Sequence, residues 1–341
     1  MTDLTYADLG WTVHFARLSD ADTTCPLRIA EVHRTAVTAL SLTGEHHLRV
    51  PLGTGTLAVG DWVLADDGNV THTFDRQSLI KRRAAGTEAR EQLIAANVTT
   101  LGIVSSCNAD FNERRLERYL VLAADAGCLP LVILTKADQT EDPDAYVRRA
   151  ERLSPLLTAI AIDATDPLET RRLHAWVRAG DTLALVGSSG VGKTTLRNAL
   201  TGEAAAVQDI REDDAKGRHT TTSRALVRTL AGGWLIDTPG MRALRLADAS
   251  EGIEAVFSDI EDLSAACRFG DCSHETEPGC AVQAAIEQGS LDPDRLRRWR
   301  KLRAEDMRNS ETIAQARARG KDFGKMVKGV MKRKRWERRG P

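Results

Sequence analysis

The stretch TLALVGSSGVGKTTLRNALTG, residues 182–202, decides the fold class, because an apolar strand, a glycine-rich loop and a helix follow one another in it. Residues 187–195 match the pattern G-x-x-x-x-G-K-[ST], in which glycines let backbone N–H groups and a helix N-terminus face phosphates. Lys193 is expected to bridge the outer phosphates of a nucleotide, and the Thr194 hydroxyl to ligate Mg²⁺. The stretch therefore predicts a nucleotide-binding α/β domain, without separating ATP from GTP. The residues expected to contact the nucleotide here are Gly187, Ser188, Ser189, Gly190, Val191, Gly192, Lys193, Thr194 and Thr195.

Apolar runs with little alternation lie on both sides of this loop along the chain. They are TLGIVSS (100–106), LVILT (131–135), TAIAID (158–163), TLALVG (182–187) and GWLIDTPG (233–240). Strands of this kind are buried on both faces, which is typical of a parallel sheet flanked by helices. We therefore assign residues 86–246 to one α/β domain.

Two segments after the phosphate loop are expected to complete a site for magnesium and the γ-phosphate. Asp237 ends a strand 44 residues after Lys193, where it can hold Mg²⁺ through a water, and the N–H of Gly240 can contact the γ-phosphate. The polar loop GRHTTTS, residues 217–223, offers threonine hydroxyls, among them Thr221, that could close on Mg²⁺. A solvent-exposed loop rich in threonine is the alternative reading of the second segment.

The tetrapeptide TKAD, Thr135, Lys136, Ala137 and Asp138, ends a buried strand before the phosphate loop. A carboxylate at Asp138 can accept both N1–H and N2–H₂ of guanine, a donor pair that adenine lacks, while the Lys136 stem lies along the base. Asp163 and Ala164 end the next strand, where the N–H of Ala164 could meet the guanine O6. These segments favour GTP over ATP.

Residues 27–85 read as a small β-barrel that follows an N-terminal extension, residues 1–26. Short runs with partial alternation are separated by turn residues, namely LRIAEV (27–32), HLRVPL (47–52), GDWVLA (60–65) and VTHTF (70–74). An OB-like barrel is one candidate, but the strand pattern does not separate it from an SH3-like barrel. The aromatic residues Trp62 and Phe74 are expected in the core rather than on an RNA-binding face.

Three of the six cysteines cluster within fourteen residues, and this cluster predicts a zinc site in residues 247–290. The candidate ligands are Cys267, Cys272, His274 and Cys280. Three thiolates and one imidazole complete a closed tetrahedral structural site and leave no open position for catalysis. The remaining thiols, Cys25, Cys107 and Cys128, are scattered and are expected to be buried or inert.

The C-terminal residues 291–341 combine a helix with a basic tail. Asp292 and Pro293 suit a helix start, and an apolar stripe follows at Leu296, Trp299 and Leu302. Residues 321–341 carry nine Lys or Arg against two acidic residues, so the tail has a charge of +7 and the rest of the chain about −8. Such a tail favours a polyanionic partner such as RNA, with residues 332–336 as the expected contact, although a solvated helix end is the alternative.

The order TKAD, GSSGVGKTT, GRHTTT, DTPG, with a barrel before and CRFGDCSHETEPGC behind, resembles the ribosome small-subunit-dependent GTPases of the RsgA (YjeQ) type, a circularly permuted family. The resemblance covers nearly all of residues 27–290. It implies a multidomain α/β protein with an OB-like barrel, a permuted P-loop GTPase domain with a mostly parallel sheet, and a C-terminal zinc-binding helical domain. It also implies that His219 takes the role of the water-orienting residue, since Met241 follows the D-x-x-G motif where Gln is common.

The family further implies a GTPase that binds the small ribosomal subunit and its rRNA, assists its late maturation, and hydrolyses GTP to GDP with stimulation by the subunit. Lys193, Thr221 and His219 are the expected catalytic residues, GTP/GDP, Mg²⁺ and one structural Zn²⁺ the expected cofactors, and Thr194, Thr221 and Asp237 the Mg²⁺ ligands. With neither an apolar span nor a secretory leader in the sequence, we expect a cytoplasmic monomer without membrane contact. A zinc-stabilised RNA-binding module with incidental hydrolysis and a P-loop ATPase or kinase are the alternatives.

Overall fold

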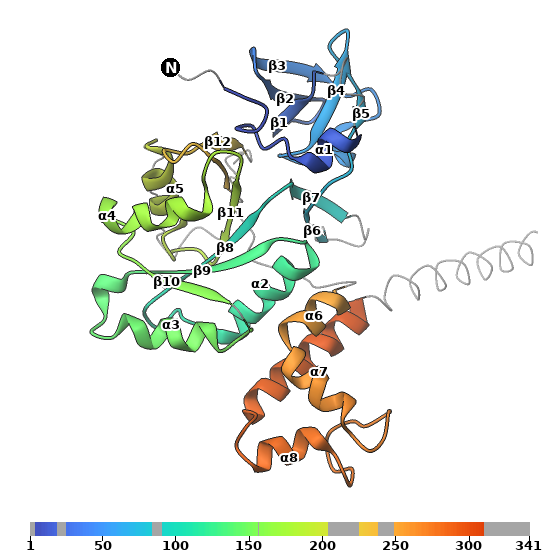
Figure 1. Cartoon of the computed structure of the whole chain (residues 1–341), viewed down its shortest axis with the longest axis vertical. Helices are drawn as coiled ribbons and strands as arrows, with labels where there is room; N and C mark the ends of the chain where they lie inside the picture. The colour runs from blue at the N-terminus through green and yellow to red at the C-terminus, as the bar shows by residue number, and fades with distance from the viewer. Residues whose placement is uncertain are drawn as a thin grey trace, which may run out of the picture.

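Figure 1 shows the computed structural model of the chain, in which a small barrel, a central sheet with its helices, and a group of C-terminal helices follow one another. The structure describes residues 4–18, 25–83, 91–155, 157–203, 225–237 and 249–309. The loop 217–223, Gly240, Met241 and the basic tail lie outside these described residues. No helix within the described ranges is long and apolar enough to span a bilayer.

A six-stranded sheet with the order β10-β9-β8-β11-β13-β12 forms the centre of the molecule. Its strands are β8 Thr100–Ser106, β9 Leu129–Thr135, β10 Thr158–Ala161, β11 Thr182–Gly187, β12 Leu226–Arg228 and β13 Trp234–Asp237. All neighbouring pairs are parallel except the edge pair β12 and β13. Every residue of β8 and β11 is buried, as the unalternating runs predict. The parallel sheet is therefore confirmed, and β12, with three residues, is too short to show a period in the sequence.

Helices cover both faces of this sheet, and the sheet separates two hydrophobic cores. They are α2 Glu113–Asp125, α3 Pro143–Glu151, α4 Pro167–Thr170 and α5 Lys193–Thr201, with the 3-10 turns η2 Ala137–Gln139 and η3 Arg171–Trp176. Successive strand residues enter different cores: Ile103 belongs to the core that contains α2, and Val104 to the core that contains α5. This division follows from the alternating direction of side chains along a strand.

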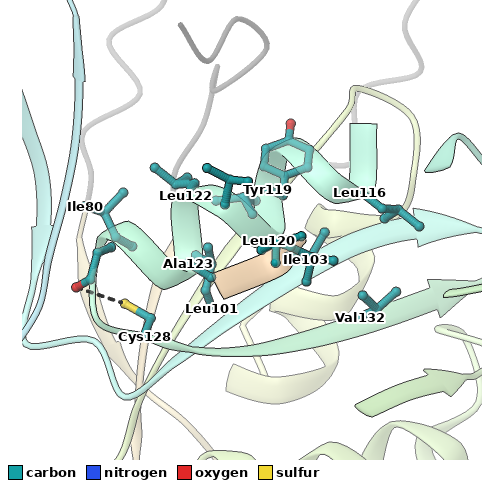
Figure 2. Close-up of a cluster of buried hydrophobic side chains, with 14 of the residues drawn as sticks. Ile80, Leu101, Ile103, Leu116, Tyr119, Leu120, Leu122, Ala123, Cys128 and Val132 are labelled. Atoms are coloured by element: carbon teal, nitrogen blue, oxygen red, sulfur yellow. Dashed lines mark hydrogen bonds between the residues drawn. The ribbon is translucent and has the colours of Figure 1, made fainter. Parts of the chain in front are cut away.

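Helix α2 is buried on two sides. Figure 2 shows Leu120 and Ala123 on the side of α2 that faces Leu101 of β8, and Tyr119 and Leu122 on the opposite side. Tyr119 and Leu122 are nevertheless only 4% and 5% exposed. The second side is therefore covered by another part of the chain.

The barrel consists of five strands in the closed order β1-β2-β3-β5-β4, with β1 pairing to β4. They are β1 Leu27–Val32, β2 Ala36–Ser41, β3 Gly44–Arg49, β4 Trp62–Asp66 and β5 Asn69–Thr73, and a 3-10 turn, η1 Thr54–Thr56, lies between β3 and β4. This Greek-key order is that of an OB barrel rather than an SH3-like one. Strand β3 ends before Pro51, where the sequence pattern extends to residue 52, because proline has no N–H for the ladder. Trp62 and Phe74 are 0% and 3% exposed, which confirms them as core residues.

The N-terminal residues and a two-stranded sheet join the barrel to the central sheet. This small sheet pairs β6 Leu79–Arg83 with β7 Glu91–Ala96, and a short helix, α1 Val13–Leu18, precedes the barrel. Trp11 packs edge-on against Trp62, with ring centroids 4.8 Å apart. The guanidinium of Arg28, 1% exposed, donates to the Leu9 carbonyl at 2.5 Å and to Thr182 Oγ1 at 2.7 Å. Extension, barrel and sheet thus share buried contacts.

The C-terminal unit, residues 249–309, consists of α6 Ser250–Val256, α7 Ser258–Ala265, α8 Ala281–Glu287 and a helix over 293–309. Leu296, Trp299 and Leu302 on the last helix are each at most 5% exposed, which confirms the predicted apolar stripe. Helix α6 covers α2: a Cβ added at Gly252 would lie 2.6 Å from the carbonyl oxygen of Val121. The C-terminal unit is therefore seated on α2 (Figure 1).

Candidate functional site

The phosphate loop connects β11 to α5 at the carboxyl edge of the sheet. Gly187 has φ +147°, and a Cβ there would lie 2.3 Å from the carbonyl oxygen of Val104, so only glycine fits. Helix α5 begins at Lys193, directly after Gly192, and among the described residues no side chain caps its N-terminus. Its first N–H groups can therefore face an anion, helped by the positive end of the helix dipole. The loop has the geometry that a nucleotide phosphate requires.

Two cationic side chains hold Ser188, the residue after Gly187. Nζ of Lys193 donates to the carbonyl oxygens of Gly187 at 2.9 Å and of Ser188 at 2.5 Å. Nη1 of Arg115, in the first turn of α2, donates to Ser188 Oγ at 2.5 Å. Positive charge is therefore placed at the loop, where charge-assisted hydrogen bonds bind phosphates most strongly. Arg115 lies outside every nucleotide motif, and sequence reasoning missed it for that reason.

The guanine loop TKAD lies at the same edge and is tied to the phosphate loop. Thr135, 1% exposed, donates its hydroxyl to the carbonyl oxygen of Val191 at 2.7 Å and to that of Ser105 at 3.1 Å. Thr135 stands where GTPases usually carry Asn, and its hydroxyl supplies a link between the loops. Lys136 adopts the left-handed conformation with φ 59°, which turns the chain out of β9 and into η2, where Asp138 lies. The structure thus brings the two predicted loops together.

The loop after β10 faces TKAD across a cavity of about 420 Å³, whose lining includes Asp138, Asp163 and Glu169. The N–H of Asp163 donates to Glu169 Oε2 at 2.8 Å. The Asp163 carboxylate accepts from the hydroxyl of Thr165 at 2.7 Å and from its N–H at 2.8 Å, and these hydrogen bonds hold the pKa of Asp163 below its usual range. Asp163 therefore shapes the turn that presents Ala164. Glu169 is a further residue of this site without a motif in the sequence.

The two described candidates for Mg²⁺ lie on neighbouring elements. Thr194 is the second residue of α5, and Asp237 is the last residue of β13, where it pairs with Leu185 two residues before the phosphate loop. This placement agrees with a shared ion at the sheet edge. The third candidate, Thr221, and the predicted catalytic His219 lie outside the described residues.

The predicted zinc ligands converge between α7 and α8. The ligand atoms of Cys267, Cys272, His274 and Cys280 all lie within 4.8 Å of one another. Sγ of Cys267 is 3.9 Å from Sγ of Cys280, and these two sulfurs are 3.5 and 3.6 Å from Nδ1 of His274. Zinc–sulfur and zinc–nitrogen bonds of about 2.3 and 2.0 Å in a tetrahedron give ligand separations of about 3.5–3.8 Å. The four residues therefore fit a tetrahedral zinc ion.

The surroundings of this cluster favour the metal-binding forms of His274 and Cys267, whereas desolvation raises the pKa of Cys272 to about 11 and favours its thiol. Burial and the nearby positive charge of Arg300 lower the pKa of His274, which favours the neutral imidazole. Burial by itself raises the pKa of Cys267, but hydrogen bonds from nearby backbone N–H groups bring it below the usual value. The carbonyl oxygen of His274 accepts from Arg300 at 2.7 Å, which fixes the ligand loop to the helix 293–309. Zinc in this cluster would thus be linked to the last helix.

The scattered cysteines are not alike. Cys107 and Cys128 are buried, as expected, and burial raises the pKa of each thiol to about 11, with the nearby Asp138 charge adding to the effect at Cys107. Cys25 is exposed, because it precedes the first barrel strand instead of lying in it. The expected burial is therefore wrong for Cys25.

A phosphate loop and a guanine loop at one edge of a parallel sheet, with the guanine loop first in the chain, define a circularly permuted P-loop GTPase. A family model described as RsgA GTPase matches residues 73–247. Two relatives cover most of the chain: "Small ribosomal subunit biogenesis GTPase RsgA 2" of Vibrio parahaemolyticus is 46% identical over 96% of this chain and 93% of its own, and "Small ribosomal subunit biogenesis GTPase RsgA" of Mesorhizobium japonicum is 49% identical over 89% and 90%. The chain belongs to the RsgA GTPase family.

Two solved structures share the fold. YjeQ from Thermotoga maritima has a TM-score of 0.60 at 23% identity and covers 82% of this chain and 97% of its own. A structure described as YloQ, a circularly permuted GTPase, has a TM-score of 0.58 at 21% identity and covers 83% and 95%. Both structures support the same fold, in which a barrel, a permuted sheet and C-terminal helices follow one another along the chain.

Proposed function

We propose that the chain binds the small ribosomal subunit, assists its late maturation, and hydrolyses GTP to GDP and phosphate with stimulation by the subunit. The catalytic part of this proposal rests on the guanine loop and the phosphate loop lying at one sheet edge, where the Thr135 hydroxyl links them by donating to the Val191 carbonyl oxygen. The names of the relatives support the ribosomal part. The proposal includes the domain bounds 1–26, 27–85, 86–246, 247–290 and 291–341, and a cytoplasmic monomer.

At the nucleotide site, the residues of this chain bind the guanine base and orient the phosphates. Asp138 accepts the guanine donors, the N–H of Ala164 meets O6, and Lys193 with the loop N–H groups neutralises the phosphates. Thr194, Thr221 and Asp237 would hold Mg²⁺, which would supply neutralisation of phosphate charge. The phosphate-loop backbone and Thr195 complete the contacts.

The water that attacks the γ-phosphate needs an orienting side chain. Met241, after the D-x-x-G motif, makes no useful hydrogen bond to water, so His219 takes this role in our proposal. His219→Ala is expected to retain GTP binding and lose most turnover. An unchanged rate would exclude His219.

GTP state is proposed to control association with the ribosome. The segment that follows DTPG leads along the chain into the C-terminal unit, where Cys267, Cys272, His274 and Cys280 would hold Zn²⁺ and so stabilise the ligand loop. The basic residues 332–335 and Trp336 are proposed to contact rRNA by phosphate neutralisation and stacking. Deletion of residues 321–341 should lower both the ribosome affinity and its salt dependence.

The deciding experiment measures single-turnover GTP hydrolysis with and without purified small subunits. Stimulation by the subunit supports the proposal, whereas a nucleotide-dependent ribosome affinity with no stimulated hydrolysis supports a binding module. Competition of ATP against GTP for the site tests the nucleotide. ATP binding as tight as GTP binding would contradict the assignment of Asp138.

A further inference from the structure

Helix α2 contacts the phosphate loop at its start and the C-terminal unit along its length. Its first turn contributes Arg115, whose Nη1 lies 2.5 Å from Ser188 Oγ. The neighbouring Arg114 is exposed and makes no such contact with the loop. Of these two adjacent arginines in the first turn of α2, only Arg115 contacts the phosphate loop.

The next residues of α2 bind the last helix, 293–309, through paired charges. Arg118 donates to both carboxylate oxygens of Glu305, each at 2.6 Å. Glu117, fully buried, accepts from Nε of Arg298 at 2.9 Å and from Nη1 of Arg295 at 3.3 Å. Buried or bidentate pairs of this kind are geometrically demanding, so the last helix can hold these partners only in a narrow range of positions.

The two sets of contacts are close together on one stiff element. Arg115 and Arg118 are separated by about 4.5 Å along the helix axis, at a rise of about 1.5 Å per residue. The body of α2 is packed against β8 on one side (Figure 2), and it also packs against α6, where a Cβ at Gly252 would lie 2.6 Å from the carbonyl oxygen of Val121. A shift of the first turn therefore cannot be absorbed by bending, and it reaches the pairs with the last helix.

The charge of a bound nucleotide is expected to affect Arg115. Ser188 lies between two cations, since Arg115 binds its hydroxyl and Lys193 binds its carbonyl oxygen. GTP brings one more phosphate than GDP, and thus more negative charge, to the loop that Arg115 contacts. The two nucleotides therefore interact differently with Arg115, which is what a shift between two states requires.

We propose that α2 couples the nucleotide in the phosphate loop to the seating of the C-terminal unit, and that Arg115 is the positioning residue that carries this coupling. The inference rests on GTP binding by the proposed function, but it names a route through α2 that no nucleotide motif contains. By reciprocity, the factor by which the nucleotide shifts the seating of the C-terminal unit equals the factor by which that seating shifts nucleotide affinity.

The test uses the full chain loaded with zinc and compares Arg115→Gln with the matched control Arg114→Gln and the conservative variant Arg115→Lys. Hydrogen exchange of residues 293–309 is measured with GDP and with a non-hydrolysable GTP analogue. The exchange of this helix should differ between the two nucleotides in the unaltered chain and in Arg114→Gln, and Arg115→Gln should abolish that difference. Arg115→Lys, which keeps the charge, should restore part of it.

Affinity for the GTP analogue provides the second readout. Arg115→Gln should weaken binding about tenfold, the effect of one hydrogen bond from a charged donor, and Arg114→Gln less than about twofold. Glu305→Gln should weaken binding although Glu305 lies on the C-terminal helix, and the double variant Arg115→Gln/Glu305→Gln should lose less than the product of the two. The exposed Lys301→Gln on the same helix is the control for Glu305.

The outcomes separate the inference from the proposed function. If the unaltered chain binds no GTP, the proposed function fails. If it binds GTP, the inference is overturned by equal exchange of residues 293–309 with both nucleotides, by a nucleotide difference in Arg115→Gln equal to that in Arg114→Gln, or by fully multiplicative affinity losses. A melting temperature of Arg115→Gln equal to that of Arg114→Gln shows that the loss is not one of folding.

Discussion

Thr135→Val removes the hydrogen bond between the guanine loop and the phosphate loop while keeping the shape of the side chain. The Thr135 hydroxyl is 1% exposed and lies 2.7 Å from the carbonyl oxygen of Val191 and 3.1 Å from that of Ser105. It has one hydrogen to donate, so the shorter contact, to Val191, is the stronger bond. The substitution leaves that carbonyl in a buried place without this donor.

The magnitude follows from the burial. A buried acceptor that loses its donor costs about 1–3 kcal/mol, and about 1.4 kcal/mol corresponds to a factor of ten. Because the nucleotide needs both loops in place, we expect GTP affinity to fall by about tenfold, within limits of about 5- and 150-fold. The melting temperature should also fall, since the bond exists without nucleotide.

A titration with a fluorescent GTP analogue and a thermal melt measure the two effects. Thr158→Val is the matched control, because Thr158 lies at the exposed start of the neighbouring strand β10. It should change neither quantity. If Thr135→Val binds GTP as tightly as Thr158→Val, the hydroxyl does not hold the loops together and the reasoning is wrong.

Three further predictions concern the base, the metal cluster and the thiols. Asp138→Asn should shift preference from GTP toward xanthosine triphosphate, because an amide cannot accept both guanine donors; competition assays that still favour GTP would contradict the reading of TKAD. Cys280→Ser should lower bound zinc and the melting temperature relative to the control Cys25→Ser, measured by metal analysis and calorimetry, and equal zinc in both variants would exclude Cys280 as a ligand. Burial raises the pKa of Cys107 and Cys128 to about 11, so only about a thousandth of each thiol is thiolate at pH 8. Iodoacetamide should therefore label the exposed Cys25 first, and Cys107 and Cys128 only as the pH approaches 11 or the chain unfolds. Rapid labelling of Cys107 or Cys128 at pH 8 would refute this prediction.

Local patterns predicted much of the fold. The parallel strands were recognisable because β8 and β11 are apolar on both faces, and the last helix because Leu296, Trp299 and Leu302 repeat at helical spacing. Both signals depend on residues that are close together in the chain. The barrel type was not predictable, since it depends on which strands pair, and β3 pairs with β5, its neighbour in the barrel but not in the chain.

The candidate site divides in the same way. The phosphate loop and TKAD are contiguous segments, and their positions at one sheet edge follow from parallel strands. Glu169 and Arg115 carry no motif, because each acts on a loop formed by another part of the chain. Their roles appear only when the loops are assembled.

By itself the sequence determined that this protein binds a nucleotide through a P-loop, that a guanine loop comes before it, and that three cysteines and a histidine form one cluster. These features are chemical groups at short spacing, so the chain's own connectivity brings them together. Only the tertiary structure decided that Arg115 meets Ser188 and that Arg118 meets Glu305, partners 73 and 187 residues apart. The physical reason is that a long-range pair is selected by the packing of α2 between the sheet and α6, and no local pattern encodes that packing.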